Sequence, residues 1–69
     1  MYISEWQAYT DGVDIVLHNA VEVGEVDVND IVWQGPSGDY FVGQPLTAEE
    51  EEAYAEYSDA GSVREYLHE

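Results

Sequence analysis

Acidic side chains dominate this sequence, and almost nothing in it can neutralise them. The 69 residues include 16 Asp and Glu but a single base, Arg64, so the formal net charge is −15. Self-repulsion on this scale strains a compact state, although it favours solubility. We therefore expect the charge to serve either a positively charged partner or the solvent in which the protein works.

The chain is long enough for one small domain, which we expect to span residues 1–69. A core of this size is near the lower limit for independent folding, so a homodimer is compatible with the length. The sequence is 45% hydrophobic and 13% aromatic, and its apolar residues recur periodically, which argues against a disordered acidic tail. Cysteine is absent, so a disulfide framework is excluded.

Membrane and nucleic acid are both poor partners for such a chain. The opening stretch, MYISEWQAYTDG, lacks the basic start and apolar run of a signal peptide, and no segment is apolar for long enough to span a membrane. Anionic lipid and nucleic acid would both be repelled. The expected location is the cytoplasm, that of the host cell if a phage encodes the protein.

The first half of the sequence predicts β-structure. Residues 2–18 alternate around Asp11-Gly12, a typical two-residue hairpin loop, which would place Trp6 on a hydrophobic face. From Val21, the stretch VEVGEVDVNDIVW alternates valines with acids and predicts a further strand with a bulge or short turn at Gly24.

A second hairpin is predicted around GPSG, from about Val28 to Val42. This register sets Trp33 beside Tyr40 and Val32 beside Phe41. Apolar residues would then lie on both faces, so the hairpin is either covered on both sides or offers an aromatic patch to a partner.

A main helix is predicted to begin at Thr47, whose spacing to Glu50 is that of a capping box, and to end at Gly61, a typical C-cap residue. A second box, Ser62 to Glu65, predicts a short C-terminal helix. The order of elements indicates an α+β fold, in which a small antiparallel sheet of about four strands packs against one main helix and the short C-terminal helix. We expect strand to exceed helix.

The expected main helix carries a line of acids. At about 100° per residue, Glu49, Glu52, Glu56 and Asp59 share one arc, while small and aromatic residues form the opposite arc and are expected to pack. The helix dipole disfavours Glu56 and Asp59 near the C-terminal end, and each repels an acid three or four residues away. Four carboxylates over about 15 Å have a charge spacing of the same order as the roughly 3.4 Å between phosphates of one DNA strand. The line therefore resembles a row of phosphates.

Other residues are expected to extend this surface. The acids of the predicted strands are Glu22, Glu25, Asp27, Asp30 and Asp39. Six tyrosines and two tryptophans exceed what a small core can bury, and such residues dominate binding hot spots. Tyr9, Tyr40 and Tyr66 are therefore candidates for a partner face, with plain packing as the alternative.

In size and charge the chain resembles the small acidic DNA-mimic inhibitors carried by phages and mobile elements, including anti-CRISPR, anti-restriction and uracil-DNA glycosylase inhibitor proteins. The resemblance includes no shared motif, and those inhibitors have no common fold. It implies a non-enzymatic inhibitor that occupies the basic nucleic-acid-binding groove of a host protein, such as a CRISPR effector or another defence enzyme.

Two alternatives remain open. The acids suit an ordinary small domain of a halophile, which has exchanged Lys for Asp and Glu to stay hydrated in high salt. They also suit an acidic interaction subunit that docks a basic protein unrelated to nucleic acid. The response to salt separates the halophile from the mimic, because the domain of a halophile should unfold when its self-repulsion is no longer screened.

Neither catalysis nor metal binding is indicated. His18 and His68 are the only histidines, and neither has a visible nucleophile or orienting partner; we expect His18 to pair with Glu5 across the first hairpin. The acids of DGVD and DVND do not fit the calcium-loop spacing, and GPSG lacks the lysine of a phosphate loop. No catalytic residue, metal or cofactor is expected.

Overall fold

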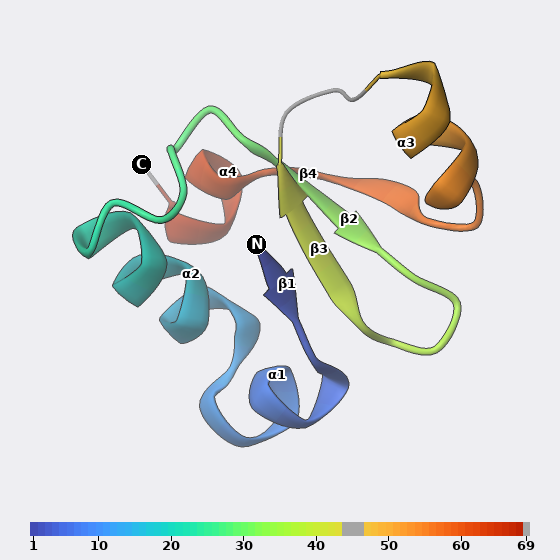
Figure 1. Cartoon of the computed structure of the whole chain (residues 1–69). Coiled ribbons are helices and arrows are strands. Elements are labelled where there is room, and N and C mark those ends of the chain that lie inside the picture. The colour runs from blue at the N-terminus through green and yellow to red at the C-terminus, as the bar shows by residue number, and fades with distance from the viewer. Residues whose placement is uncertain (44–46, 69) are drawn as a thin grey trace.

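The computed structural model describes residues 1–43 and 47–68, and within them four strands form one antiparallel sheet in the order β1-β3-β2-β4 (Figure 1). The elements follow the chain as β1 (Tyr2–Ile3), α1 (Glu5–Asp11), α2 (Val13–Glu22), β2 (Ile31–Gln34), β3 (Tyr40–Gly43), α3 (Ala48–Ala53), β4 (Ser58–Ser62) and α4 (Val63–Leu67). The predicted α+β class, with its small antiparallel sheet and short C-terminal helix, is confirmed.

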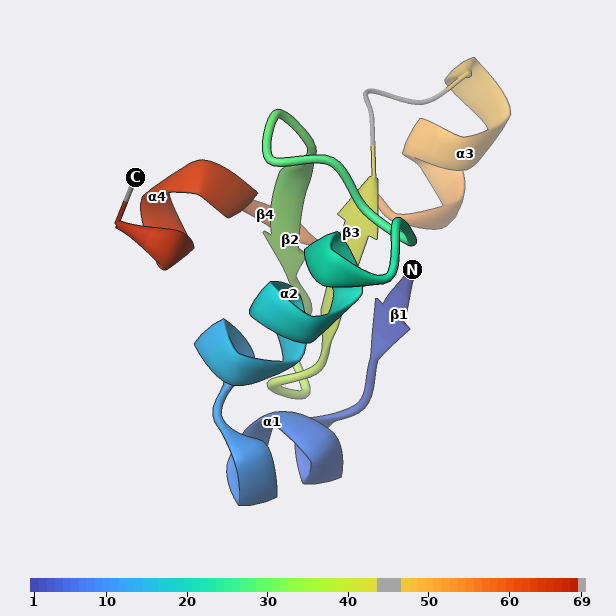
Figure 2. The same cartoon turned by 90° about the vertical axis from the view of Figure 1, so that its left-hand side faces the viewer.

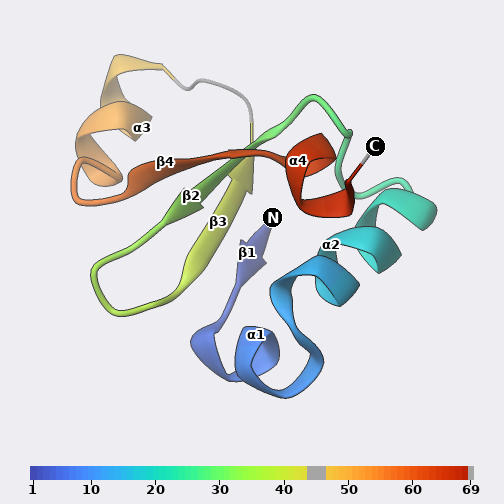
Figure 3. The ribbon, with the colours of Figure 1, turned by 180° about the vertical axis from the view of Figure 1, so that it is seen from behind.

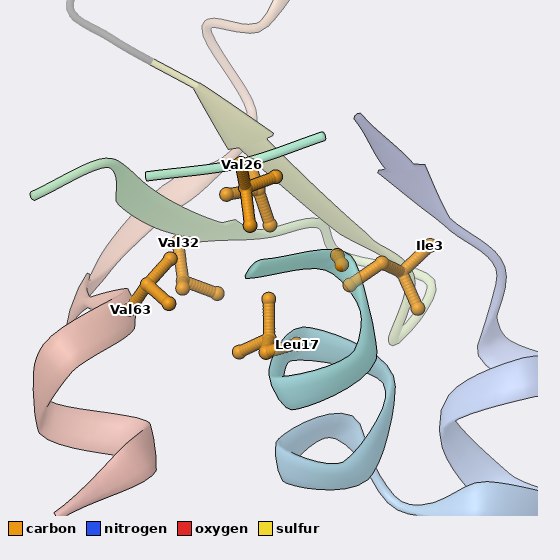
Figure 4. Close-up of a cluster of buried hydrophobic side chains, with 7 residues drawn as sticks. Ile3, Leu17, Val26, Val32 and Val63 are labelled. Carbon is orange, nitrogen blue, oxygen red and sulfur yellow. The ribbon is translucent and has the colours of Figure 1, made fainter. Parts of the chain in front are cut away.

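The hydrophobic core lies between one face of the sheet and the helices α2 and α4 (Figures 2 and 4). Figure 4 shows Leu17 of α2 and Val63 of α4 directed toward Val32 of β2. The buried core residues are Ile3, Leu17, Ala20, Val26, Val32, Val42 and Val63. All of them are aliphatic, and Tyr40 and Tyr66 pack against this cluster while remaining partly exposed.

The second face of the sheet is aromatic. Because side chains alternate along a strand, Phe41 faces away from Val42, and the register pairs Phe41 with Trp33 on one side and Tyr2 on the other. The ring of Tyr54 stacks on Phe41 with centroids 4.5 Å apart, and Tyr57 meets Tyr54 edge-on at 5.3 Å. Of the two alternatives left open for the second hairpin, these contacts favour coverage on both sides.

The second hairpin itself is confirmed, but its register was wrong by one residue. Trp33 pairs with Phe41 rather than Tyr40, and Val32 pairs with Val42. A slip of one residue exchanges the two faces of a strand. The observed register gathers the valines against α2 and the rings on the opposite face.

The first predicted hairpin is wrong, because residues 5–22 form two helices. Ser4 caps α1 through a reciprocal box, in which the Gln7 N–H donates to Ser4 Oγ (3.2 Å) and the Ser4 N–H donates to Gln7 Oε1 (3.4 Å). Gly12, at φ 79°, ends α1 and begins α2. The Asp11-Gly12 pair therefore separates two helices. A glycine at positive φ is typical of the C-cap of a helix as well as of a hairpin loop.

Two consequences follow for the first half of the chain. His18 and Glu5 lie exposed on different helices rather than opposite each other on strands. The strand predicted from Val21 is also wrong, because α2 continues to Glu22 and a loop with a turn at Gly24 (φ 81°) leads to β2. Helical residues consequently outnumber strand residues in the described ranges, contrary to expectation.

The main helix predicted from Thr47 to Gly61 ends early, at Ala53. Two tight turns follow, closed by the Ala55 N–H on the Glu52 carbonyl (3.3 Å) and by the Tyr57 N–H on the Tyr54 carbonyl (2.9 Å). The chain then enters β4, which pairs with β2. Early termination removes Glu56 and Asp59 from the C-terminal end of a helix, where the dipole and the neighbouring acids would have opposed them.

The end of the chain follows the prediction more closely. α4 begins after its N-cap Ser62 and ends at Leu67, and the C-cap His68 adopts the left-handed conformation at φ 59°. Gly61 is part of β4 rather than a C-cap; at φ 107° it occupies a bulge where the pairing of β4 with β2 shifts by one residue. Within the described residues no helix is long and apolar enough to cross a membrane.

Candidate partner-binding surface

All the described acids lie at the surface, since no charged residue of the described chain is buried. The predicted row of four does not form, however. Glu49 and Glu52 lie one turn apart on α3, Glu56 lies in the turn that follows, and Asp59 lies on β4. All four are exposed, as is Glu51. We refer to residues 49–59 as the acidic segment.

The acidic segment is anchored to the sheet by its tyrosines. Tyr54 stacks on Phe41, and the Tyr57 hydroxyl donates a hydrogen bond to Asp39 Oδ2. The Tyr2 hydroxyl donates to the same oxygen at 3.2 Å. Asp39 thus joins β1, the β2–β3 turn and the entry to β4, and the exposed acids are carried on a packed segment.

The hydrogen bonds at Asp39, which we call the anchor, shift the pKa values of the residues that form them. The hydrogen bond to Asp39, together with partial burial, raises the pKa of Tyr57 to about 12. The same bond lowers the pKa of Asp39, because it stabilises the carboxylate. Gly35 leaves room for this arrangement, since a Cβ there would stand 3.0 Å from the Tyr57 ring. Asp39, predicted as a partner contact, therefore has a structural role.

Four of the five predicted strand acids lie in a second region, at the end of α2 and in the loop between α2 and β2. Asp27 Oδ1 accepts the Asn29 N–H (2.8 Å), and Asp30 Oδ2 accepts the Asp27 N–H (3.0 Å). Arg64 adds a hydrogen bond from its guanidinium to Asn29 Oδ1 (3.3 Å). Both aspartates thus shape the loop, which the start of α4 holds in place.

The remaining two acids of that region, Glu22 and Glu25, are exposed. The loop and α3 stand at opposite sides of the molecule in Figure 1, and Figure 3 shows the same separation from behind. The structure therefore does not bring the ten predicted site residues together. It divides the acids between the acidic segment, the α2–β2 loop and the anchor at Asp39.

The candidate tyrosines also separate. Tyr40 and Tyr66 are half-buried and pack against the core, and burial raises the pKa of Tyr66. Tyr9 is 82% exposed on α1, beside Trp6, which is 70% exposed. Their ring centroids are 6.2 Å apart and the rings are inclined by 27°. We call Trp6 and Tyr9 the aromatic pair.

Sequence reasoning missed Trp6, because the predicted hairpin placed it in the core. Two signals could have found it. Ser4 and Gln7 have the spacing of a capping box, and Trp6 and Tyr9 stand three residues apart, which makes them neighbours on a helix.

A shallow hollow of about 390 Å³ lies between α2 and α4 and includes Asp14, Glu65, Tyr66 and His68 in its lining. A neighbouring hollow shares three of these residues and adds His18. In the described parts of the chain, no three side chains of His, Cys, Asp or Glu are grouped so that they could hold a metal ion. Both hollows are thus lined by at least one histidine and one acid.

Comparison with known proteins adds nothing to this description: no family model matches the sequence, and neither a curated protein nor a solved structure matches the chain.

Proposed function

We propose that this protein is a non-enzymatic inhibitor that mimics nucleic-acid phosphates and occupies the basic nucleic-acid-binding groove of another protein, such as a CRISPR effector or another defence enzyme. One observation carries the proposal. Sixteen acids face a single base, and the described acids lie at the surface. Such a surface is complementary to a groove lined with Lys and Arg.

The acidic segment is the best candidate for the contact. It displays four exposed glutamates within residues 49–56: Glu49, Glu51, Glu52 and Glu56. The tyrosines of the same segment pack on the sheet, so the glutamates are displayed on an ordered support. Presentation from an ordered element reduces the entropy lost on binding.

Individual pairs on such a surface are weak. An exposed ion pair contributes about 0.2–1 kcal/mol, so binding must rest on many pairs and depend strongly on salt. Electrostatic steering should raise the association rate most. A groove that normally binds phosphates already offers many cations at short spacing, which is why it suits this partner.

The test compares two double charge reversals that change the net charge equally. Glu52→Lys with Glu56→Lys alters the acidic segment, and Glu22→Lys with Glu25→Lys alters the α2–β2 loop. The parent protein is used to capture a partner from a lysate of the source or host cell, and a labelled duplex or RNA is then bound to that partner. We expect the parent and the loop variant to displace the nucleic acid and the segment variant to fail.

Two outcomes would contradict the proposed function, and a third would contradict the role of the acidic segment. A captured partner that binds no nucleic acid would favour an acidic subunit for a different basic protein. Unfolding of the parent at low salt, measured by circular dichroism between about 10 mM and 1 M NaCl, would favour the halophile, since the Debye length falls from about 30 Å to 3 Å over that range. Equal loss of displacement in both variants would show that total charge matters and the segment does not.

A further inference from the structure

We infer that the aromatic pair on α1 is a second contact, which receives an arginine side chain from a basic segment of the partner. The inference deepens the proposed function and rests on it for the class of the partner. Trp6 is 70% exposed and Tyr9 is 82% exposed. Large rings displayed this openly on a small domain mark an interaction site more often than a scattered apolar residue does.

The two rings are arranged so that a planar guanidinium can stack on them. Trp6 and Tyr9 lie three residues apart on α1 and are nearly parallel, with centroids 6.2 Å apart. The capping box of Ser4 and Gln7 fixes the start of the helix, and the Thr10 hydroxyl donates to the Trp6 carbonyl (2.9 Å). The pair is therefore displayed on a helix whose first turn is secured.

The charges around the pair select the occupant. Glu5 and Asp11 are the charged residues of α1, and Asp14 lies in the first turn of α2. All three carboxylates are exposed. On a domain with a formal net charge of −15, exposed aromatic faces attract a guanidinium, which can stack on a ring through a cation–π contact.

The same charges disfavour other occupants. A nucleic-acid base could stack on the pair, but its phosphates would meet the acids. An anionic membrane would be repelled for the same reason. A second copy of the chain would bring another −15 of charge to the interface.

The pair is separate from the acidic segment. Figures 1 and 2 show α1 at the opposite end of the molecule from α3, and the longest extent of the molecule is 29 Å. A partner that contacts both regions must therefore extend along the whole length of the domain, as a nucleic-acid groove does.

The experiment uses the intact chain and a capped tetra-arginine peptide, followed by ¹H–¹⁵N correlation spectra at near-physiological salt. We expect the Trp6 indole signal to move on titration. Replacing both rings, as Trp6→Ala with Tyr9→Ala, should weaken the affinity measured at the α1 amides by about 5- to 30-fold, the equivalent of one to two cation–π contacts. The affinity measured at the amides of Glu51 and Glu52 should stay unchanged.

Ile15→Ala is the matched control, because Ile15 is 55% exposed on the neighbouring helix and has no ring; we expect it to bind like the parent. The titration of the parent protein tests the inference even if a variant fails to fold, because it needs only the Trp6 signal of the unaltered chain. A Trp6 signal that stays still while the α3 amides saturate would overturn the inference, as would an unchanged affinity of the double variant. Trp6 shifts that depend on protein concentration without peptide would assign the pair to a second copy instead.

The outcomes also separate this inference from the function on which it rests. If the segment variant loses displacement of nucleic acid while the peptide never reaches Trp6, only the second contact is wrong. If the peptide stacks on the pair but no captured partner binds nucleic acid, the arginine site stands and its partner belongs to another class.

Discussion

Replacing Tyr54 with alanine tests whether the aromatic packing on the outer face holds the acidic segment in place. The side chain has two ring contacts, a stack with Phe41 at 4.5 Å and an edge-on contact with Tyr57 at 5.3 Å. Each such pair contributes about 0.5–1.5 kcal/mol beyond the area it buries. Loss of part of the buried area of a large side chain adds about 1 kcal/mol.

Tyr54→Ala should therefore lower the free energy of unfolding by roughly 2–4 kcal/mol. A chain of this length is expected to be stable by only about 3–10 kcal/mol in total. One kcal/mol shifts the midpoint of a small domain by about 4–8 °C, so the thermal midpoint should fall by at least about 8 °C. The measurement is thermal unfolding followed by circular dichroism, checked by urea titration.

Two controls make this result specific to the ring contacts. Tyr54→Phe keeps both of them and should unfold close to the parent. Tyr9→Ala removes a ring that is 82% exposed and contacts only Trp6 among the ring pairs of the described chain, so it should change the midpoint by no more than a few degrees. If Tyr54→Ala is as stable as Tyr9→Ala, the outer face does not hold the segment, and the reasoning is refuted.

Three further changes test other parts of the structure. Gly61→Ala should lower the free energy of unfolding by about 1–3 kcal/mol, because φ 107° strains any residue with a Cβ; a neutral result in urea titration would contradict the bulge in β4. Tyr57→Phe should remove the pH-dependent stabilisation that comes from the hydrogen bond between Tyr57 and Asp39. The pKa of Tyr57 in the folded protein is about 12, above its usual value of 10. The bond therefore stabilises the fold fully below pH 10, and this stabilisation is lost as the pH rises through 12. The difference in thermal midpoint between parent and Tyr57→Phe should shrink over that window, and a constant difference would exclude the bond to Asp39 as its source. Ser4→Ala should destabilise by about 0.5–2 kcal/mol through loss of the α1 cap, while Gln7→Ala, which keeps the Ser4 acceptor, should have the smaller effect in the same unfolding assay.

Local signals of the sequence predicted the elements that depend on local structure. The turn between β2 and β3 is marked by GPSG and bounded by apolar runs, and Ser62 marks the start of α4. Both elements are confirmed. The turn residues act locally, whereas Ser62 precedes α4 without a side-chain capping hydrogen bond, so the predicted capping box does not form.

The first half of the chain could not be assigned in this way. The alternation of apolar and polar residues around Asp11-Gly12 is compatible with a hairpin. The same segment also has the apolar spacing of an amphipathic helix, and the structure shows that helix. The residues with this spacing are Val13, Val16, Leu17 and Ala20. Short apolar segments are ambiguous between the two periods. The Ser4 capping box would have favoured helix.

The end of α3 depends on distant partners. No glycine, asparagine or proline occurs in the four residues after Ala53, and the chain leaves the helix to pair with β2, more than twenty residues earlier in the sequence. Tertiary pairing overrides local propensity at such points. The grouping of the candidate site failed for the same reason: exposure of the acids followed from their charge, whereas their division between three regions followed from the fold.

The two kinds of acid differ in how the fold uses them. Aspartates at four places accept hydrogen bonds that shape the backbone or the anchor: Asp27, Asp30, Asp39 and Asp59, the last from the Gly61 N–H at 2.8 Å. A short carboxylate reaches nearby backbone N–H groups and stabilises turns.

Four glutamates of the acidic segment contrast with these aspartates because their side chains extend into solvent. Glu49, Glu51, Glu52 and Glu56 are exposed, and their neighbours in the segment are acids of the same sign. Replacing them with glutamine should therefore preserve or raise stability by reducing self-repulsion, whereas replacing Asp39 with asparagine should lower it. Charge that stabilises nothing within the domain is charge available to a partner, which is why the glutamates, rather than the aspartates, are the residues on which binding should depend.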